Sequence, residues 1–460
     1  MVDRVLGFAE ALAEVLRQAA TLAMPRGAER VTLSEAAGRV LATAVRAGRD
    51  QPPFHRSTRD GFAVRAADVG RALRVVGSVK AGEVWRGAAL GEDETIEIMT
   101  GAPLPEGADA VVMVEHVAIQ GGVLTVQAGR GVRAGENVVP RGAEARAGDT
   151  LLPVGRLLGA AEIAVAASCG YAELEVFARP RVAIVATGDE LVELPGSVHP
   201  THGDETAMDG APGGSGSAMS GPPGGSGSAM SGPPGGLLGD AKIYNSNSYA
   251  LAALVRAEGG VAGRLEIARD THDDVWERIA QGSMWDLLLL SGGVSMGKFD
   301  LVEEVLAEFD AEFFFTGALI QPGKPIVFGR LPKRGGTAHP QDGPWTGEWT
   351  YFFGLPGNPV STQVCFHLFV APLLRALAGC TDVAPQFVEA KLAEDVRGGA
   401  KVTRFLPAEM ISAWEGVTVR VVGWQGSGDV AANARGNCYC VLPAGVESFA
   451  KGETVRVLLR

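Results

Sequence analysis

Cysteine is scarce in this sequence, and its spacing argues against two cross-linked architectures. Only five cysteines occur among 460 residues, an odd number with no C-x-x-C pair. A disulfide framework and a thiolate zinc site are both disfavoured, and a reducing cytoplasm is the expected location. Cys438 and Cys440 would share one face of a strand, where packed thiols are more common than metal ligands.

Long hydrophobic runs and an excess of basic residues are missing as well. No stretch reaches the roughly 18 uninterrupted apolar residues that a membrane-spanning helix needs. The apolar segment near the start is interrupted by Glu10, Glu14 and Arg17 at helical spacing, which indicates an amphipathic helix rather than a signal peptide. The net charge of −12 argues against broad nucleic-acid binding, because that activity needs a basic face to displace counterions.

Two phosphate-binding fingerprints are also absent. The sequence has no Walker A loop and no G-x-G-x-x-G fingerprint in a βαβ context, which weakens P-loop and dinucleotide-binding interpretations.

His199 and His202 in "HPTH" are close enough to share a metal, but they border a low-complexity segment. We therefore expect them to be solvated loop histidines.

The spacing of apolar and turn-forming residues changes several times along the chain, which predicts a multidomain α/β plus β protein. Residues 1–49 with 145–176 have helical texture, including a second helix opened by Ser34. Residues 50–144 alternate short β-branched runs with turns and predict a small β domain. Residues 177–380 alternate strands and helices, which predicts a mostly parallel sheet covered on both faces. Residues 381–460 return to alternating strands and predict a β-barrel-like domain.

One low-complexity segment interrupts the α/β region. The string "GGSGSAMSGPP" occurs twice in succession, from residue 213 to 223 and from 224 to 234. The surrounding stretch, about 197–236, contains almost nothing able to form a core, so we expect a flexible insertion there.

Three glycine turns follow strands of the α/β region. They are "VATGDEL", "LSGGVSMG" and "LPGNPVS". Glycine lets backbone N–H groups approach an anion, and the positive end of a following helix adds to the attraction. One such turn is weak evidence, but in a parallel sheet all three would meet at one edge. Candidate binding residues in these turns are Thr187, Gly188, Gly292, Gly293, Ser295, Asn358 and Ser361.

Carboxylates lie beside these turns. Glu190, Asp270 and Asp300 each stand at or near the end of a predicted strand. Acids beside an anion site repel a phosphate unless a cation bridges them, which favours a hard, oxygen-liganded metal such as Mg²⁺. The alternative is that Asp270 and Asp300 only cap the helices that follow.

Further polar candidates lie in proline- or glycine-containing loops. "QPGKP" holds Lys324 between Pro322 and Pro325, although a simple surface lysine is an alternative. "STRDGFAV" places Asp60, and "MTGAPLPEG" places Thr100, beside glycine. Each of these two segments on its own is typical of a turn.

Taken together, these stretches resemble one known family. "PPFHRSTRDGFAV", "IMTGAPLPEGADAVV", "VAIVATGDELVE", "IYNSNSYAL", "LLLLSGGVSMGKFDLV", "PGKPIVFG", "FGLPGNPVST" and "GSGDVAANARGNCYCVLPAGVESFAKGETVRVLL" are similar, in collinear order, to the molybdopterin molybdenumtransferases of the MoeA and gephyrin E-domain family. Several of the motifs also occur in the adenylyltransferases of the same pathway. The flanking β domain and the C-terminal β domain favour the molybdenum insertase.

The resemblance implies an elongated homodimer of four domains per chain, in which residues 1–49 with 145–176 form the dimerisation domain. The active cleft is expected between the α/β domain of one subunit and the β domain of the other. The implied reaction converts adenylyl-molybdopterin and molybdate into molybdenum cofactor, AMP and water, with Mg²⁺ assisting. The implied catalytic residues are Asp60, Glu190, Asp270, Asp300 and Lys324, with Glu190, Asp270 and Asp300 as metal ligands. Implied substrate contacts outside the glycine turns are Thr100, Glu144, Pro322, Pro325, Arg404 and Ser427.

The sequence departs from the family pattern at a few positions. Where many relatives read "RRGED", this chain reads "PRGAE", so Glu144 replaces an aspartate and Ala143 replaces an acid. Gln321 and Gly317 stand where some members carry lysine. The presumed anion site therefore has up to two fewer cations.

Two other functions remain open from the sequence. An adenylyltransferase of the same pathway is expected to need only the α/β domain, not residues 1–175 or 385–460. A non-catalytic scaffold that binds partner peptides would not need acids around an anion site. Release of AMP on addition of molybdate separates the insertase from both.

Overall fold

The chain folds into two compact units. The computed structural model describes residues 4–22, 27–195, 241–293, 301–334, 345–398 and 401–460. The smaller unit is Ala28–Val176, and the larger unit combines Met1–Gly27 with Phe177–Arg460. Ser295, Asp300, both histidines of "HPTH" and the repeated insertion lie outside the described residues.

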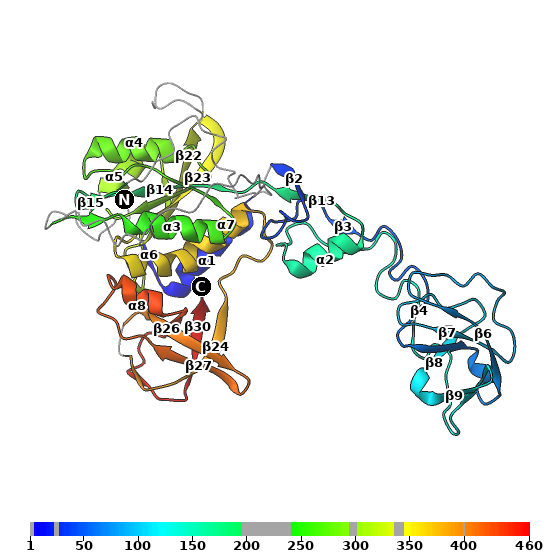
Figure 1. Ribbon diagram of the computed structural model, residues 1–460. Helices are drawn as coiled ribbons and strands as arrows, with labels where there is room; N and C mark the ends of the chain where they lie inside the picture. Colours follow the sequence, from blue (N-terminus) through cyan, green and yellow to red (C-terminus); the bar gives the residue numbers. More distant parts are fainter. Residues whose placement is uncertain (1–3, 23–26, 196–240, 294–300, 335–344, 399–400) are drawn as a thin grey trace, which may run out of the picture. The chain divides into compact units, whose positions relative to one another are not determined.

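A six-stranded sheet organises most of the smaller unit (Figure 1). Its order is β8-β5-β7-β6-β10-β9, and only the β6–β7 pair is parallel. Successive residues of β5 enter different cores, because Phe62 and Val64 pack on one face and Ala63 on the other. The strands are β5 (Gly61–Val64), β6 (Leu73–Val79), β7 (Glu94–Ile98), β8 (Ala110–Met113), β9 (Val117–Gln120) and β10 (Val123–Val126), with 3₁₀ turns at Ala66–Asp68 and Val114–His116.

Short strands from the first part of the smaller unit pair with short strands from its last part. The short pairs are β2 (Ala28–Thr32) with β13 (Glu173–Phe177), β3 (Val45–Arg46) with β12 (Thr150–Leu152), and β4 (Arg56–Ser57) with β11 (Val138–Val139). Helix α2 (Ala160–Ser168) packs on this part.

The helix expected after Ser34 is wrong. Residues 34–44 form turns and bridges, with Val40 opposite Leu157 and Leu41 opposite Val176. Gly38 has φ +74°, which interrupts a helix at its centre. The apolar side chains of this segment, such as Ala36 and Leu41, do not form one helical face but pack separately against β12, β13 and α2.

A second six-stranded sheet, in the order β17-β14-β18-β23-β22-β19, forms the centre of the larger unit. The first four strands are parallel, and β22 and β19 are antiparallel additions, so the predicted mostly parallel sheet is confirmed. The strands are β14 (Arg181–Ala186), β17 (Val261–Arg264), β18 (Leu287–Ser291), β19 (Glu312–Phe315), β22 (Val327–Arg334) and β23 (Trp345–Leu355).

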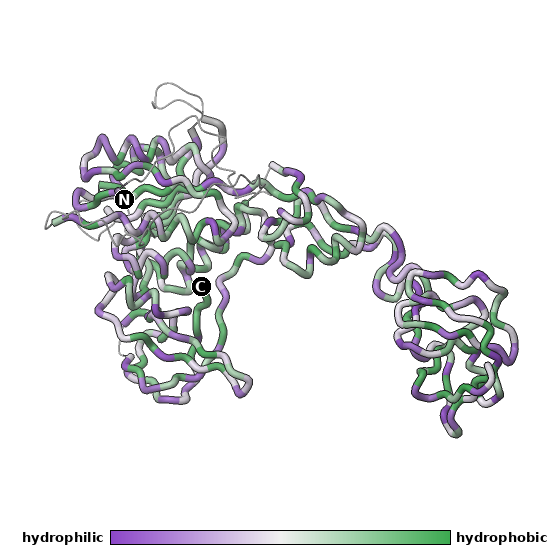
Figure 2. The backbone as a smooth tube through the Cα atoms, in the orientation of Figure 1, coloured by the Kyte–Doolittle hydropathy of each residue, from purple (hydrophilic) through white to green (hydrophobic). Residues whose placement is uncertain are grey.

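Helices cover both faces of this sheet, as the alternation predicted (Figure 1). Ile184, Leu289 and Phe353 pack towards α1, α3 and the α6–α7 segment, while Val185 and Leu290 pack towards α4 and α5. Figure 2 shows mainly hydrophobic residues along the central strands. The helices are α1 (Phe8–Thr21), α3 (Ser246–Ala257), α4 (His272–Gly282), α5 (Leu301–Glu308), α6 (Pro359–Cys365) and α7 (Ala371–Leu377).

The N-terminal helix belongs to the larger unit, not to a domain ending at residue 49. Ala11 and Val15 of α1 are fully buried in the same core as Leu373 of α7. Strand β1 (Val5–Leu6) pairs in parallel with β20 (Gly317–Ala318). The apolar stripe of α1 is therefore satisfied by the α/β domain, and the domain boundary falls near Gly27.

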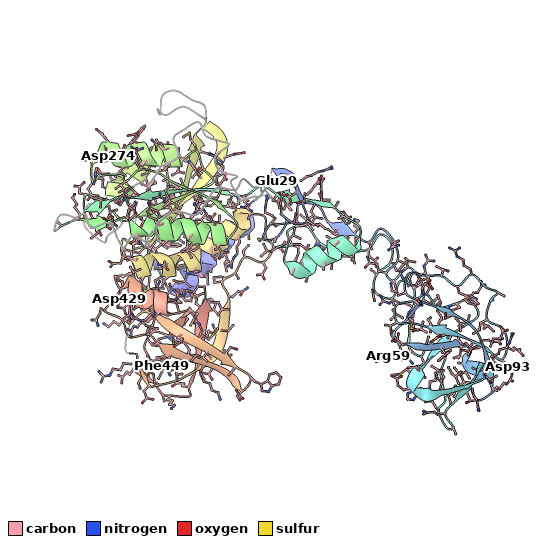
Figure 3. All side chains as sticks on the ribbon, viewed as in Figure 1. Glu29, Arg59, Asp93, Asp274, Asp429 and Phe449 are labelled. Carbon is pink, nitrogen blue, oxygen red and sulfur yellow. The ribbon has the colours of Figure 1, made fainter. Side chains whose placement is uncertain are left out.

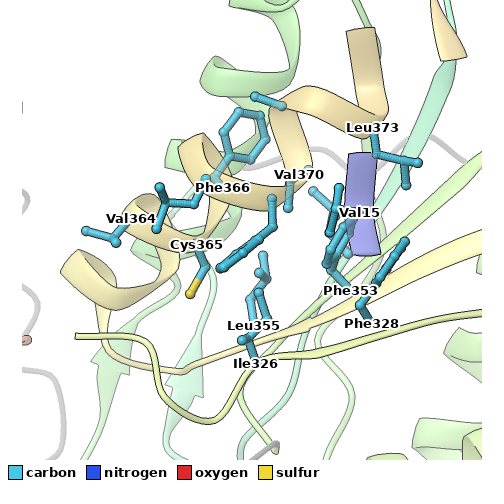
Figure 4. Close-up of a cluster of buried hydrophobic side chains, with 14 of the residues drawn as sticks. Val15, Ile326, Phe328, Phe353, Leu355, Val364, Cys365, Phe366, Val370 and Leu373 are labelled. Atoms are coloured by element: carbon cyan, nitrogen blue, oxygen red, sulfur yellow. The ribbon is translucent and has the colours of Figure 1, made fainter. Parts of the chain in front are cut away.

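One continuous helical segment lies in this core. Helices α6 and α7 are joined by a π-helical turn, Phe366–Val370. By length and composition alone, the combined segment Pro359–Leu377 could cross a membrane. Its apolar window is 78% buried inside the protein. Figure 4 shows Cys365 and Phe366 of this segment packed with Val15, Phe328 and Leu355. The segment is therefore packed as a core helix.

A closed five-stranded barrel completes the larger unit, as the resemblance implied. Its order is β26-β27-β24-β30-β28, and β28 pairs back to β26. Cys438 and Cys440 are both fully buried inside it, as packed thiols, and burial raises their pKa values to about 11 and about 12. The barrel elements are β24 (Phe387–Leu392), β26 (Thr403–Ala413), β27 (Gly416–Val421), β28 (Cys438–Leu442) and β30 (Thr454–Leu459), with helix α8 (Val430–Arg435) and the short pair β25 (Val396–Arg397) and β29 (Ser448–Phe449).

Candidate active site

The carboxyl ends of β14, β18 and β23 bring the three glycine turns together. Thr187 donates its backbone N–H to the Ser291 carbonyl at 3.0 Å, and Gly292 donates to the Leu355 carbonyl at 3.1 Å. Gly292 has φ +98°, and a β-carbon there would lie 2.5 Å from the Thr187 carbonyl oxygen. A β-carbon on Gly357 would lie 3.6 Å from the Cα atom of Gly292. Glycine at 292 is thus required by both backbone angle and space.

The hydroxyl of Thr187 has no hydrogen-bond partner among the described residues. The side chain is only 3% exposed, and its Oγ1 atom is buried. A β-carbon on Gly292 would lie 3.0 Å from Oγ1, and one on Gly293 would lie 2.7 Å from it, so the hydroxyl faces the second turn closely. A buried hydroxyl without a partner costs about 1–3 kcal/mol. Such a group is well suited to binding a polar atom of a ligand.

The acidic loop after β14 is tied to the loop before α4. Asp189 donates its N–H to Asp270 Oδ2 at 3.4 Å, and Asp270 donates its N–H to Asp189 Oδ1 at 3.3 Å. Glu190 is exposed, and its carboxylate lies over Gly188, 2.6 Å from where a β-carbon would be. The structure therefore places the predicted residues Gly188, Glu190 and Asp270 in one cluster.

Asp270 is not the helix cap that the alternative interpretation assumed. The N-cap of α4 is Thr271, whose side chain accepts from the N–H of Asp274. Asp274, labelled in Figure 3, lies in the first turn of α4 and itself accepts from the N–H of Arg269. The carboxylate of Asp270 therefore does not cap α4 and instead accepts the hydrogen bond from Asp189 in the acidic loop.

Two cationic side chains that the sequence reasoning missed brace this loop. Lys242 Nζ donates to the Asp189 carbonyl at 2.6 Å. The guanidinium of Arg269 donates to the carbonyls of Asp189 and Leu191 at 3.4 and 3.3 Å. Arg269 directly precedes Asp270 in the sequence, but nothing local indicates that its side chain folds back onto residue 189.

The third turn connects the α/β domain to the barrel. Asn358 precedes α6 and donates its amide Nδ2 to Ser427 Oγ at 2.8 Å. The N–H of Val360 donates to the Ser427 carbonyl at 3.0 Å. Ser361, in the first turn of α6, is 4% exposed. Asn358 and Ser427, 69 residues apart, are therefore neighbours in one part of the site.

The "QPGKP" loop is fixed by its glycine as well as by its prolines. A β-carbon on Gly323 would lie 2.6 Å from the Cys365 sulfur, and the Cys365 thiol donates to the Gly323 carbonyl at 3.6 Å. The carbonyl of Lys324 accepts from the N–H groups of Ala318 and Ile326, both at 3.0 Å. The Lys324 side chain is exposed between half-buried Pro325 and buried Pro322.

Arg404 of the barrel lies beside this loop. In the parallel pair of β21 (Ile320–Gln321) with β26, Arg404 stands opposite Gln321. Its guanidinium donates to the Arg397 carbonyl at 3.2 Å, while its Nε atom is buried with no hydrogen bond to the described part of the chain. The arginine is therefore held in place with part of its donor capacity unused.

In the smaller unit, Asp60 and Thr100 form a direct pair. Asp60 Oδ1 accepts from the Thr100 N–H at 2.7 Å and from the Thr100 hydroxyl at 2.8 Å. The backbone bond first, and the hydroxyl bond second, hold the pKa of Asp60 below its usual value. Glu144 pairs with Arg56 at 2.9 Å. Asp60 is thus exposed, and both of its bonds to Thr100 favour its ionised form.

The carboxylates of Glu190 and Asp270 near the acidic loop are chemically suitable ligands for a magnesium ion. Carboxylate oxygens are the ligands that Mg²⁺ prefers. Among the described residues no group of three or more His, Cys, Asp or Glu side chains is arranged to hold a metal. Asp300, the third predicted ligand, and Ser295 are outside the described residues.

The fold and site together define a class. Glycine turns and acids at the strand ends of a parallel α/β sheet are typical of proteins that bind small phosphate-bearing molecules. Here that sheet is joined to a closed β-barrel. Three family models match this chain: "MoeA N-terminal region (domain I and II)" over residues 6–170, "Probable molybdopterin binding domain" over 183–376 and "MoeA C-terminal region (domain IV)" over 389–459.

Whole-chain relatives agree with these matches. Proteins named molybdopterin molybdenumtransferase from Staphylococcus aureus strain MRSA252 and from Staphylococcus epidermidis strain RP62A are 31% and 30% identical, covering 98% and 93% of this chain and 94% and 90% of their own. A crystal structure titled molybdopterin biosynthesis MoeA protein from Pyrococcus horikoshii OT3 has a TM-score of 0.73 at 25% identity, covering 99% of this chain and 100% of that one. The chain belongs to the MoeA family of molybdopterin molybdenumtransferases.

Proposed function

We propose that this chain inserts molybdenum from molybdate into adenylylated molybdopterin, releasing AMP. In this reaction adenylyl-molybdopterin and molybdate give molybdenum cofactor, AMP and water, in the last step of molybdenum cofactor biosynthesis. The observation that carries the proposal is the gathering of Thr187, Gly292 and the acids Glu190 and Asp270 at one sheet edge of a MoeA family member.

The glycine turns bind the phosphates in this proposal. Gly188, Gly292, Gly293, Asn358 and Ser361 border the sheet edge, and of these Gly293 and Asn358 are exposed where an anion would approach. The N–H groups of Gly188 and Gly292 already donate to the carbonyls of Ala268 and Leu355, so these two glycines contribute space rather than a hydrogen bond. Lys324 adds a positive charge from a loop that prolines and Gly323 hold still. Pro322, Pro325, Arg404 and Ser427 complete the substrate and oxyanion contacts from the side of the barrel.

Magnesium is part of the proposal as the ligand of Glu190, Asp270 and Asp300. When bound, such an ion neutralises and polarises a phosphoanhydride. The protein's own contribution is to hold two acidic loops together through the paired backbone bonds of Asp189 and Asp270. Removal of divalent metal with a chelator is expected to stop AMP release and leave the fold intact.

We further propose a cytoplasmic homodimer in which the β domain of one subunit completes the site of the other. Asp60, Thr100 and Glu144 are the residues that the β domain brings to the shared site. The Asp60–Thr100 pair supports this role, because two donors keep the carboxylate ionised without using its second oxygen. An adenylyltransferase of the same pathway is less well supported, since the family matches extend over residues 6–170 and 389–459 as well.

The decisive experiment is single-turnover release of AMP. Purified protein is incubated with adenylyl-molybdopterin and Mg²⁺, and AMP is followed by chromatography before and after molybdate is added. Molybdate-dependent release supports the insertase. An adenylate that stays intact under these conditions rules the proposal out, and formation of adenylyl-molybdopterin from ATP would favour the adenylyltransferase instead.

A further inference from the structure

Asn247 connects the two glycine turns at the sheet edge. It lies on α3, after Ser246 and the N-cap Asn245. Its Nδ2 atom donates to the Gly357 carbonyl at 2.7 Å and to Ser291 Oγ at 2.9 Å, and it lies 3.4 Å from Thr362 Oγ1. One side-chain amide therefore contacts the end of β18, the turn after β23 and helix α6.

The orientation of this amide follows from its partners. The Gly357 carbonyl only accepts hydrogen bonds, so the atom that faces it must be the nitrogen of Asn247. Ser291 and Thr362 are 2% and 1% exposed, so water has little access to replace the amide. The hydroxyl of Thr362 also donates to the Pro356 carbonyl, which extends the same network along the third turn.

The connected turns are those that carry the proposed phosphate contacts. Gly292 follows Ser291 directly, and Gly357 precedes Asn358. The two glycines approach closely, because a β-carbon on Gly357 would lie 3.6 Å from the Cα atom of Gly292. A donor that bonds to both turns from behind fixes the distance between their backbone amides.

We propose that Asn247 is a positioning residue that holds the glycine turns of β18 and β23 as a single anion cradle. It does not touch the substrate but sets the spacing of the groups that do. Glycine turns have high backbone freedom, so without the tether their amides would have to be ordered by the ligand at a cost in affinity. The inference rests on the proposed function for the identity of the bound anion.

The test compares Asn247→Ala and Asn247→Asp with the wild-type protein. Loss of the two short bonds is expected to raise the Kd and KM for adenylyl-molybdopterin by about tenfold, with a smaller change in kcat. Asn247→Asp is expected to be worse, because it keeps the shape but places a carboxylate against the Gly357 carbonyl. The Kd is measured by titration without molybdate.

A matched control separates positioning from general destabilisation. The side chain of Asn437 in the barrel also bonds to backbone groups. It donates to the Met410 carbonyl at 2.9 Å and accepts from the Met410 N–H at 2.8 Å. Asn437→Ala is expected to lower the free energy of unfolding by a similar amount and leave the Kd unchanged.

Amide hydrogen exchange tests the tether without any substrate. Exchange at residues 291–293 and 357–358 is expected to accelerate in Asn247→Ala and not in Asn437→Ala. Unchanged exchange there, or a Kd within twofold of wild type in both Asn247 variants, overturns the inference. If wild type binds adenylyl-molybdopterin but releases no AMP, the proposed function fails while the exchange data still decide the role of Asn247.

Discussion

Among the single residues of the candidate site, the hydroxyl of Thr187 stands out for its lack of a partner in the described part of the chain. It is buried, it has no partner among the described residues, and it faces the turn of Gly292 and Gly293. A buried hydroxyl without a partner costs about 1–3 kcal/mol, and we expect the substrate of the proposed reaction to supply the missing hydrogen bond. The neighbouring Thr362 hydroxyl differs, because it bonds to the carbonyls of Pro356 and Asn358.

Thr187→Val is therefore expected to separate stability from activity. Removal of an unpaired hydroxyl at constant shape should leave the free energy of unfolding unchanged or raise it by up to about 1 kcal/mol, while the KM for adenylyl-molybdopterin rises. Urea unfolding and steady-state kinetics measure the two effects. Thr362→Val is the control, and it should lose about 1–3 kcal/mol because its bonded partners are left unpaired. A similar loss in Thr187→Val would show that its hydroxyl is satisfied in the free protein.

The Asp60–Thr100 pair gives a titration at the same scale. Thr100→Val removes the hydroxyl bond and keeps the backbone bond, so the pKa of Asp60 should rise part of the way towards its usual value. Because the folded-state pKa is lowered, the pair's contribution to stability is present above the unfolded-state pKa and disappears as the pH falls through the folded-state value. Carboxyl ¹³C chemical shifts followed against pH measure the change. A pKa that stays in place would mean that the hydroxyl bond does not form in solution.

Part of the site was predictable from single residues, and part was not. Glu190, Asp270, Thr187 and Gly292 follow strands of a parallel sheet, so the strand-end rule places them together. Asn247 acts through acceptors 44 and 110 residues away, and its bonds depend on how α3 packs over the sheet. A sequence pattern contains no sign of such a contact.

At the scale of elements, the α6–α7 segment shows how local chemistry shapes a helix. Pro372 has no N–H to donate, and the π-helical turn Phe366–Val370 immediately precedes the helix that contains it. This turn carries His367, 9% exposed, beside the ring of Tyr439 in the barrel. Burial first, and the charges of Arg460 and Arg375 second, lower the pKa of His367 to about 4.

Acid should therefore destabilise the protein through His367. The imidazole is neutral in the folded state down to about pH 4 but takes up a proton below about pH 6.5 when unfolded. Stability is complete above pH 6.5 and falls towards pH 4, by about 3 kcal/mol in total from this group. Urea unfolding at pH 7 and pH 5 should show a smaller loss for His367→Gln than for wild type. Equal losses in the two proteins would exclude this histidine as the cause.

Elements were predicted where the pattern was long and periodic. The strands and helices from β14 to α7 follow apolar runs and N-cap residues such as Asn245 and Thr271. The helix expected after Ser34 failed because its apolar residues are buried through separate contacts with distant strands. Strands β22 and β23 continue into the polar segment before Tyr351, with Pro332 opposite Trp349.

At the scale of the whole molecule, the predicted site residues are divided between the two units. Asp60, Thr100 and Glu144 belong to the smaller unit, and Glu190, Asp270 and Lys324 to the larger one. Within the smaller unit Thr100 bonds to Asp60, and within the larger unit the loops of Asp189 and Asp270 bond to each other. A site that needs both sets can be completed within one chain or between two, and the proposed dimer makes the second arrangement testable.

Mixing two inactive variants distinguishes these arrangements. Asp60→Ala and Asp270→Ala should each abolish AMP release as homodimers. If the site is shared between subunits, a mixed dimer contains one site with both substitutions and one with neither. An equal mixture after subunit exchange should therefore recover about a quarter of wild-type activity. No recovery, with exchange verified by mass spectrometry, would place both residues of a site in one chain.

The sequence by itself determined the parallel α/β sheet, the position of Glu190, Asp270 and the glycine turns after its strands, and the family. These properties depend on periodicity, turn chemistry and motif spacing, which are local along the chain. Only the tertiary structure decided that α1 joins the larger unit, that Thr271 rather than Asp270 caps α4, and that Asn247 connects the two turns. Those outcomes depend on which buried surface and which polar partner is nearest in space, and folding alone brings such groups together.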